Sequence, residues 1–188
     1  ARLVRVCCRD FITDPCDPRT LSVVLGHALG MSRLAAGERS ARADAPRIDG
    51  MVGDSEVMRR LACRVAKAAR SEAPVFLAGE TGTGKELAAA AIHRESRRRD
   101  MPFVGINCGA IPPSLMQSEL FGYERGAFTG ASQRKLGRVE LAHDGTLFLD
   151  EVADLPMESQ ASLLRFLEEG RIQRLGGHES IRVDARIV

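Results

Sequence analysis

Apolar residues follow two patterns along the chain, and the two patterns alternate. Short apolar runs bounded by glycine, proline or polar residues predict buried strands at 74–78, 102–108, 145–149 and 181–188. Apolar residues at helical spacing predict helices that carry Val57 to Ala68, Leu87 to His93 and Leu163 to Leu167. Asp54 or Ser55 is expected to cap the first helix, and Asp154 the last. Strands that alternate with helices predict an α/β fold, a parallel sheet with helices on both faces.

The chain divides into two predicted units joined by a linker. Residues 1–34 hold one predicted strand and one predicted helix, which are too few elements to bury a core. Residues 35–48 are rich in Arg, Ala, Gly and Asp without an apolar period, as in a linker. Residues 49–188 form the second unit. Because the chain starts at Ala1 and stops inside the last strand pattern, we expect it to be cut from a longer protein.

Composition narrows the class of protein. An apolar fraction of 44% and a charged fraction of 28% are ordinary for a globular chain with a sizeable core. The net charge of +2 argues against nucleic-acid binding by the whole surface, and no apolar run is long enough to cross a bilayer. The five cysteines lack the spacing of a metal site, which favours reduced thiols in a cytoplasmic protein without a membrane partner.

The stretch between the first predicted strand and the next helix has the composition of a phosphate-binding loop. It consists of Gly79, Glu80, Thr81, Gly82, Thr83, Gly84, Lys85 and Glu86. Its glycines let backbone N–H groups surround an oxyanion, the helix start adds its positive end, and Lys85 adds a full cation. Glu86 stands where Ser or Thr usually holds magnesium, so the metal must depend on other groups, such as Thr83, waters and a later acidic residue. The alternative is a glycine-rich turn with a chance lysine.

The strand at 145–149 ends in two carboxylates, Asp150 and Glu151. Ligands of open α/β sheets bind at the carboxyl ends of the strands, so Asp150 is expected to hold magnesium directly or through water. Glu151 is the expected general base or water-orienting residue. Asn107 ends the neighbouring predicted strand and is expected to hydrogen-bond Glu151 until nucleotide or a partner moves the glutamate. The alternative is an Asp-Glu pair that caps a turn.

A second stretch combines glycines with an exposed-looking aromatic residue. It consists of Gly126, Ala127, Phe128, Thr129, Gly130 and Ala131, an apolar ring and a hydroxyl between two glycines. Leaving such a ring in water is unfavourable, and burying it is worth roughly 2–3 kcal/mol. The loop is therefore either a contact device for a partner, with a reach that changes with nucleotide state, or a hairpin tip whose Phe128 folds back onto its own core.

Four stretches together resemble the central ATPase domain of bacterial enhancer-binding proteins, the AAA+ activators of sigma-54 RNA polymerase. They are the residues at 79–86, 119–122, 126–131 and 145–151. The Gly-Ala-Phe-Thr-Gly-Ala loop is the most specific feature, because other AAA+ proteins share the phosphate loop but not this insertion. Glu86 is the usual residue of this family at its position. The resemblance covers about residues 49–188 and implies a P-loop NTPase of the AAA+ type, incomplete at its C-terminus.

The resemblance implies a role for each motif. It implies that ATP binds between the subunits of a ring, a hexamer, with Lys85 on the β- and γ-phosphates. It also implies that Asp150 holds Mg²⁺ and that Glu151 holds the attacking water, with Asn107 at the glutamate-switch position. Val52 and Gly53 match the segment on the adenine side. The loop at 126–131 is implied to engage the sigma-54 RNA polymerase holoenzyme and to remodel the closed promoter complex into an open one.

Other parts of the family's machinery are expected to follow Val188. They include the sensor residues, the arginines that act across the subunit interface, and a C-terminal domain that binds promoter-upstream DNA. Because an arginine finger is typically worth roughly 10³–10⁵ in rate, we expect this isolated chain to hydrolyse ATP poorly or not at all. Two alternatives remain: a nucleotide-binding regulator without hydrolysis, and another AAA+ remodelling ATPase.

The unit at 1–34 resembles the last strand and helix of a response-regulator receiver domain. Asp14-Pro15 stands where a Lys-Pro pair is usual, so the resemblance implies a degenerate receiver without the lysine that contacts the phosphoryl group.

A smaller departure from the family pattern lies in the second unit, where Met116-Gln117 replaces a more usual Leu-Glu, and we expect little effect from it. The run from Arg97 to Arg99 is expected to be a solvated turn.

Overall fold

The computed structural model describes residues 47–188. The expectations for the receiver-like unit at 1–34, and for nearly all of the linker at 35–48, lie outside the described residues. Ile48, the last linker position, is 5% exposed and packs in a core cluster with the first two helices, so the folded unit begins before residue 49. Within residues 47–188, every helix is too short or too polar to span a bilayer.

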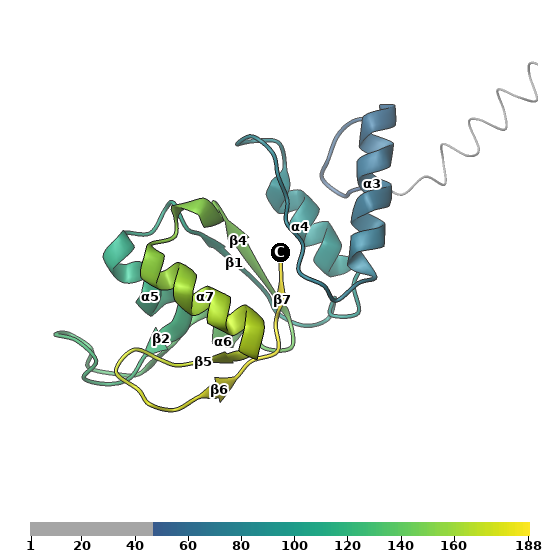
Figure 1. Cartoon of the computed structure of the whole chain (residues 1–188). Helices are drawn as coiled ribbons and strands as arrows, with labels where there is room; N and C mark the ends of the chain where they lie inside the picture. Colours follow the sequence, from purple (N-terminus) through teal and green to yellow (C-terminus); the bar gives the residue numbers. More distant parts are fainter. Residues whose placement is uncertain (1–46) are drawn as a thin grey trace, which may run out of the picture. The chain divides into compact units, whose positions relative to one another are not determined.

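A three-stranded parallel sheet lies at the centre of the described residues (Figure 1). Its strands, in spatial order, are β1 (Phe103–Asn107), β4 (Thr146–Asp150) and β7 (Arg186–Ile187). β4 is buried along most of its length because a strand flanks it on each side and helices cover both its faces. The register places Asn107 beside Asp150, so two polar strand ends lie together at the carboxyl edge of the sheet.

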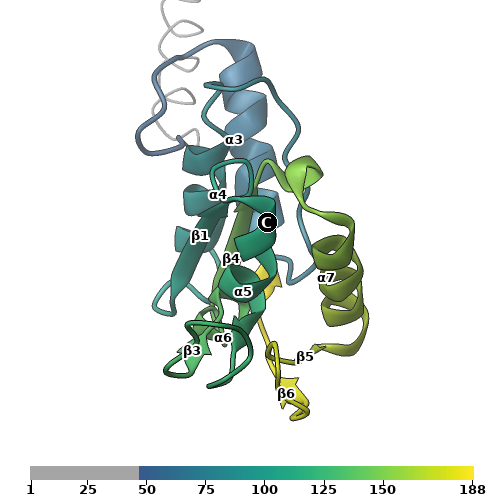
Figure 2. The same cartoon turned by 90° about the vertical axis from the view of Figure 1, so that its left-hand side faces the viewer.

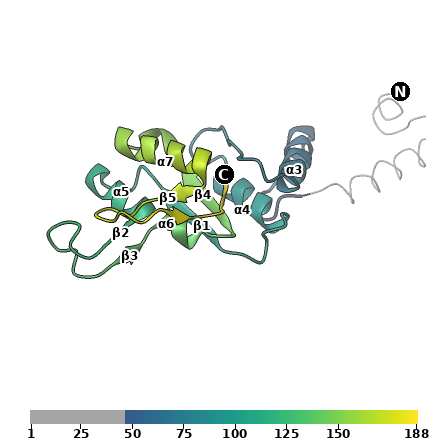
Figure 3. The ribbon, with the colours of Figure 1, turned by 60° about the horizontal axis from the view of Figure 1, so that its bottom comes forward.

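Helices cover both faces of this sheet (Figure 3). On one face, α3 (Glu56–Ala69) and α4 (Lys85–Arg94) share a core cluster with Phe148. On the other face, a second cluster holds Leu147 together with α5 (Pro113–Phe121), α6 (Arg138–Leu141) and α7 (Met157–Glu169). Neighbouring residues of a strand point to opposite faces, which is why Leu147 and Phe148 belong to different clusters. The predicted α/β architecture is confirmed.

Two short antiparallel strand pairs lie at the end of the sheet opposite the turn from β4 into α7 (Figure 2). They are β2 (Gly122–Tyr123) with β3 (Lys135–Leu136), and β5 (Arg171–Ile172) with β6 (Ile181–Arg182). A bridge between Tyr123 and Leu175 joins the two pairs. The loop at 126–131 lies between β2 and β3, so both of its ends are fixed by strand pairing.

The predicted strand at 74–78 does not form. Among the described residues its backbone makes one hydrogen bond to the sheet, from the Val75 N–H to the Ile187 carbonyl at 3.0 Å. β7 pairs over only two residues, so it offers this segment too few partners for a ladder. Phe76 is consequently 81% exposed instead of buried. The segment still leads directly into the loop at 79–84.

One of the two predicted helix caps is present in the structure, and the other is not. Ser55 caps α3, because its hydroxyl accepts a hydrogen bond from the Met58 N–H at 3.3 Å. The expectation that Asp154 caps α7 is wrong. Asp154 ends a short 3₁₀ helix, η1 (Val152–Asp154), and α7 starts only after Pro156. Proline cannot donate a backbone hydrogen bond and favours helix starts, which explains the later beginning.

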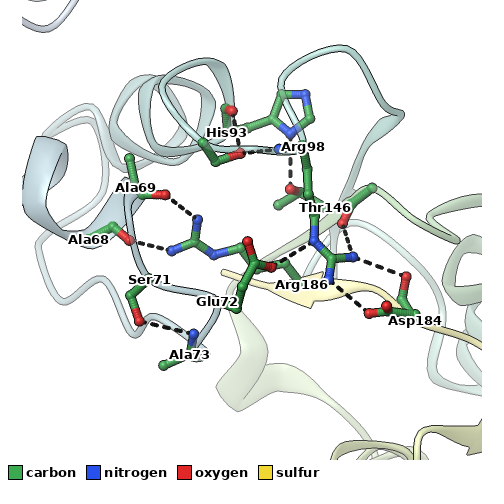
Figure 4. A network of polar contacts seen from close by, with 12 residues as sticks. Ala68, Ala69, Ser71, Glu72, Ala73, His93, Arg98, Thr146, Asp184 and Arg186 are labelled. Atoms are coloured by element: carbon green, nitrogen blue, oxygen red, sulfur yellow. Dashed lines mark hydrogen bonds and ion pairs between the residues drawn. The ribbon is translucent and has the colours of Figure 1, made fainter.

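A polar network joins α3 and α4 to the sheet (Figure 4). Arg186 of β7 is 2% exposed, and its guanidinium donates to the carbonyls of Ala68 and Ala69 at 2.6 and 3.3 Å. These carbonyls belong to the last turn of α3, beyond the reach of the regular helical hydrogen bonds. The Ala68 carbonyl also accepts from the Ser71 N–H at 3.0 Å. The ring of His93, near the end of α4, lies 2.9 Å from the hydroxyl of Thr146 at the start of β4.

Arg98 extends this network to two more segments (Figure 4). Its guanidinium donates to the carboxylates of Glu72 and Asp184, each at 2.8 Å. The Arg98 side chain is 17% exposed. The expectation of a solvated turn at 97–99 is therefore wrong for this residue, which fastens the turn before β1 to the segments before the phosphate loop and before β7.

Candidate nucleotide site and partner-binding loop

Residues 79–84 form a turn between the extended segment at 74–78 and α4. Gly84 is the N-cap of α4 and has a φ of 87°, a left-handed conformation that favours glycine. The hydroxyl of Thr83 donates to the carbonyl of Glu80 at 2.8 Å, which closes the turn. The N-terminus of α4 therefore opens onto the loop, and the positive end of the helix lies where the sequence predicts a phosphate.

Lys85 is the first residue of α4, and its ammonium group folds back over the loop. It donates to the carbonyls of Gly79 and Glu80 at 3.1 and 3.0 Å. Both acceptors are neutral, so the full positive charge of Lys85 is available to an anionic ligand that displaces them.

One cavity brings Lys85 together with the two carboxylate residues at the end of β4. It has a volume of about 580 Å³, and its polar lining includes Thr81, Lys85, Asp150 and Glu151. The rest of its lining is mostly apolar and comes from the segment at 74–78, the end of β7 and α7. A cation and two carboxylates at the carboxyl edge of a parallel sheet suit a phosphate ligand that carries a divalent cation.

The predicted nucleotide residues are not all brought into this cavity. Gly79 and Thr81 line it, whereas the other loop positions lie beside it and Glu86 is exposed in the first turn of α4. Val52, predicted for the adenine side with Gly53, is 98% exposed outside the cavity.

Met51 contacts the phosphate loop, although no pattern in the sequence pointed to it. A Cβ added at Gly84 would lie 2.9 Å from the Met51 methyl carbon. Gly53, two positions later, faces Met58 instead. The short run of Met51 and Val52 between two glycines carries no periodic signal, so only the folded chain reveals that Met51 packs here.

Asp150 is the last residue of β4, and Glu151 follows in a tight turn. Glu151 has a φ of 54°, a left-handed conformation that is costly for a residue other than glycine and is often found at functional sites. The Glu151 N–H donates to Oδ1 of Asp150 at 3.1 Å, which stabilises the turn. Because the strand ends here, the two neighbouring residues both line the cavity instead of lying on opposite faces.

Asn107 lies beside Asp150 in the sheet, but it does not make the predicted hydrogen bond. Its Oδ1 accepts from the Ala110 N–H at 3.0 Å, and the contacts of residues 47–188 include no hydrogen bond from Asn107 to Glu151. Both side chains point toward Gly109, where an added Cβ would meet the Glu151 carboxylate and, at 3.5 Å, the Asn107 amide oxygen. The two groups are therefore neighbours without a direct bond.

The electrostatics of this edge favour a cation. Burial, and then the charges of Asp150, Asp154 and Glu151, raise the pKa of the Cys108 thiol to about 11. Within residues 47–188, no three or more His, Cys, Asp or Glu side chains group closely enough to hold a metal ion by themselves. Mg²⁺ usually takes one or two carboxylates together with substrate phosphates and waters, and Asp150 beside the phosphate loop fits that kind of site.

The loop at 126–131 is a compact turn. The Gly126 N–H donates to the Ala131 carbonyl at 2.8 Å, and the Ala131 N–H donates to the Phe128 carbonyl at 3.0 Å. Gly126 and Gly130 both have positive φ values, 84° and 100°, which glycine adopts without strain. Ala131 is buried, whereas Gly126 and Gly130 are exposed.

Phe128 lies between the two arrangements that the sequence allows. It is 44% exposed, and its ring meets the ring of Tyr123 edge-on, with centroids 4.9 Å apart. Thr129 beside it is exposed. The phenylalanine therefore neither stands free in solvent nor reaches the hydrophobic core.

Arg174 fastens the base of this loop, and the sequence analysis did not identify it. Its side chain is 4% exposed and forms ion pairs with Glu124 and Glu140, each at 2.6 Å. These hydrogen bonds, first that of Glu140, raise the pKa of Arg174. The partners lie 50 and 34 positions away in sequence, so no local pattern could have revealed the contacts.

Comparison with known proteins places these features in a family. The Sigma-54 interaction domain family matches residues 51–188. The response regulator protein PilR of Pseudomonas aeruginosa is 46% identical over 179 residues, which are 95% of this chain and 39% of PilR. The Nif-specific regulatory protein of Azorhizobium caulinodans is 53% identical over 139 residues, which are 74% of this chain and 23% of that protein.

A solved structure also matches this chain in its fold. NtrX from Brucella abortus, in complex with ATP, matches with a TM-score of 0.68 and 36% identity, covering 99% of this chain and 39% of that chain. The chain thus spans about two fifths or less of the length of these relatives. The region of the family match contains the phosphate loop, the two carboxylates after β4 and the loop at 126–131. This chain therefore belongs to the Sigma-54 interaction domain family, the P-loop AAA+ domain of sigma-54-dependent transcriptional activators.

Proposed function

We propose that the protein binds and hydrolyses ATP in the cavity shared by the loop at 79–84 and the end of β4, and that it thereby activates sigma-54 RNA polymerase. The observation that carries this proposal is the placement of Lys85, Asp150 and Glu151 on one cavity. Membership of the Sigma-54 interaction domain family supports the choice of partner. The relative NtrX in complex with ATP supports the choice of nucleotide.

The phosphate loop supplies the binding site in this proposal. Backbone N–H groups at 79–84 and the N-terminus of α4 face the phosphates, with Glu86 in the first helical turn. Lys85 leaves the carbonyls of Gly79 and Glu80 and holds the β- and γ-phosphates. Val52 and Gly53 border the adenine, next to the point where Met51 packs against the loop.

The carboxylates after β4 supply the chemistry. Asp150 would hold Mg²⁺, which would supply positive charge next to the phosphoryl group that is transferred to water. Glu151 orients the attacking water, and its left-handed backbone keeps the carboxylate at the cavity. Asn107 restrains Glu151 between turnovers. A rotation of its amide away from the Ala110 N–H would allow the two side chains to bond.

The loop at 126–131 moves when ATP is hydrolysed, and it transmits this movement to the sigma-54 holoenzyme by direct contact. Phe128 and Thr129 are the side chains at its exposed tip. The intact protein acts as a ring, a hexamer, in the cytoplasm, and a further domain binds promoter-upstream DNA. The relatives PilR and NtrX are more than twice as long as this chain, which leaves room for such domains.

Binding to sigma-54 is the direct test of the partner. The intact protein with ADP and aluminium fluoride, a mimic of the hydrolysis transition state, should form a stable complex with sigma-54. Phe128→Ala should abolish this complex, whereas Gln133→Ala, an exposed position just beyond the loop, should leave it unchanged. Failure of the wild type to bind would contradict the proposed partner, and binding retained by Thr129→Ala would count against the loop.

ATP turnover tests the enzyme separately. In the intact protein, Glu151→Gln should lower kcat by about 10²–10⁴-fold, the usual contribution of such a residue, while ATP binding persists. Lys85→Ala should weaken ATP binding itself. Wild-type protein that binds ATP without hydrolysing it would favour the alternative, a regulator that signals through assembly alone.

A further inference from the structure

Tyr123 is the residue that Phe128 contacts when the loop at 126–131 is folded back. We propose that Tyr123 is a positioning residue that holds Phe128 in a stowed state, unavailable to sigma-54, until the loop is extended. The inference rests on the proposed function, in which Phe128 is a sigma-54 contact. What it adds is the side chain that stabilises the folded-back state of the loop.

The ring of Tyr123 belongs to a strand and not to the loop at 126–131. Tyr123 belongs to β2 and pairs with Lys135 of β3. A bridge to Leu175 holds it on its other side. The next residue, Glu124, is anchored through its side chain to Arg174 and through its backbone N–H to the Leu175 carbonyl at 3.0 Å. Tyr123 is therefore a stationary docking surface for the phenylalanine.

Phe128, by contrast, is carried by a segment that can rotate. Gly126 and Gly130 flank it, and both have backbone conformations that only glycine adopts easily. A Cβ added at either glycine would meet nothing within 4 Å, so the space beside both is open, and a change of conformation there breaks the loop's own hydrogen bonds, such as the one from the Gly126 N–H to the Ala131 carbonyl. The loop can therefore move Phe128 while β2 stays paired.

The two contacts of Phe128 exclude each other. Its ring lies edge-on against Tyr123 at 4.9 Å, and this contact leaves 44% of the residue exposed. The surface of the Phe128 ring that lies against Tyr123 is not available to a partner, so binding of sigma-54 through that surface competes with the pair. Aromatic pairs of this geometry favour the closed arrangement by about two- to tenfold. This preference leaves about a tenth to a third of the molecules with Phe128 free. It therefore lowers binding when the loop is not extended, and it is small enough for nucleotide to reverse.

The pair can be observed directly, because Tyr123 is the sole tyrosine of the chain. In the full chain labelled with 3-fluorotyrosine, the single ¹⁹F resonance should shift in Phe128→Leu, which removes the ring but keeps an apolar side chain. Thr129→Ala, at the exposed neighbouring position, should leave the resonance in place. A resonance that is indifferent to Phe128→Leu would overturn the stowed state.

Sigma-54 binding then tests its consequence in the intact protein. Tyr123→Ala should bind sigma-54 about two- to tenfold more tightly with ADP alone, and should gain little with ADP and aluminium fluoride. Tyr123→Phe keeps the ring pair and should behave as wild type. If the wild type binds sigma-54 and Tyr123→Ala shows the same dependence of binding on nucleotide, the positioning role of Tyr123 is overturned and the proposed function stands. Wild type that binds in no nucleotide state would overturn the proposed function and, with it, this role.

Discussion

The residues around the end of β4 occupy unusual environments. Glu151 adopts a left-handed backbone, and the Cys108 thiol is buried close to three carboxylates. These carboxylates disfavour any further negative charge, so Cys108 remains a neutral thiol and acts as core packing rather than as a nucleophile. The same negative field favours a bound cation at Asp150.

Cys63 and Cys108 should therefore react with alkylating reagents at very different rates. At pH 8, a pKa of about 11 leaves about one Cys108 thiol in a thousand as the reactive thiolate. Cys108 is also only 2% exposed, whereas Cys63 is exposed on α3. Iodoacetamide labelling mapped by mass spectrometry should find Cys63 modified at least ~100-fold faster in the folded chain. Similar rates under native conditions would show that Cys108 is accessible.

The elements next to the loop at 126–131 depend on one buried cation. Arg174 joins Glu124 at the end of β2 to Glu140 on α6. Gly176 packs so close to Ala127 that an added Cβ would lie 2.7 Å from the alanine methyl. The position of the loop is therefore determined jointly by the segment at 171–182 and by α6.

Arg174→Met should destabilise the chain substantially. Removal of one partner from a buried ion pair costs about 3–5 kcal/mol. Because Glu124 and Glu140 remain 33% and 18% exposed and can regain water, we expect about 2–3 kcal/mol in urea unfolding. Lys135→Met is the matched control, since the Lys135–Glu119 pair is more exposed and should contribute less than about 1 kcal/mol. Equal losses of unfolding free energy in the two variants would show that the ion pairs of Arg174 stabilise the chain no more than an exposed pair does.

The contact between α4 and β4 should make stability depend on pH. Burial, followed by the charge of Arg186, lowers the pKa of His93 below its ordinary 6.5. The unfolded chain thus binds a proton more readily than the folded one. The stabilisation is fully present above about pH 6.5 and is lost as the pH falls through the folded-state pKa.

His93→Asn should flatten this dependence. Asparagine can still bond the Thr146 hydroxyl but does not titrate, so its free energy of unfolding should change less between about pH 7.5 and 5.5. Chemical unfolding across this range provides the measurement. His143→Asn, at a half-exposed position, should retain the wild-type slope. An unchanged slope in His93→Asn would assign the pH dependence to other groups.

At the scale of the whole described molecule, two core clusters lie on opposite faces of one strand. Phe148 belongs to the cluster with α3 and α4, and Leu147 to the cluster with α5, α6 and α7. Both are almost fully buried. Because β4 carries both side chains on a single backbone, we expect the two clusters to unfold together.

This cooperativity can be tested with two substitutions on adjacent residues. Leu147→Ala and Phe148→Ala should lower the free energy of unfolding by about 2–5 and 3–5 kcal/mol, respectively. Urea unfolding should be followed by circular dichroism and by the fluorescence of Tyr123, the sole tyrosine, which lies at the hairpin end of the sheet. The two probes should give one midpoint in each variant. Separate midpoints in Phe148→Ala would show that the clusters are independent.

Most of the fold could be predicted from the sequence, because its elements have local signals. Strands β1 and β4 and helices α3 and α4 follow the apolar pattern closely. The segment at 74–78 has the same kind of pattern but forms no strand, because a strand also requires a paired neighbour and β7 is too short to provide one. Arg98 looks like part of a solvated run, yet distant carboxylates fix it in a network.

The sequence by itself determined the family and the identity of the candidate site. The phosphate loop, the two carboxylates after β4 and the loop at 126–131 are each made of consecutive residues, so their chemistry can be inferred from order and spacing alone. Only the tertiary structure decided how these parts are held. It placed Arg174 between two distant glutamates, turned the Asn107 amide oxygen to Ala110 and packed Phe128 on Tyr123. These contacts depend on which surfaces meet when the chain folds, and a strand or helix pattern carries no information about them.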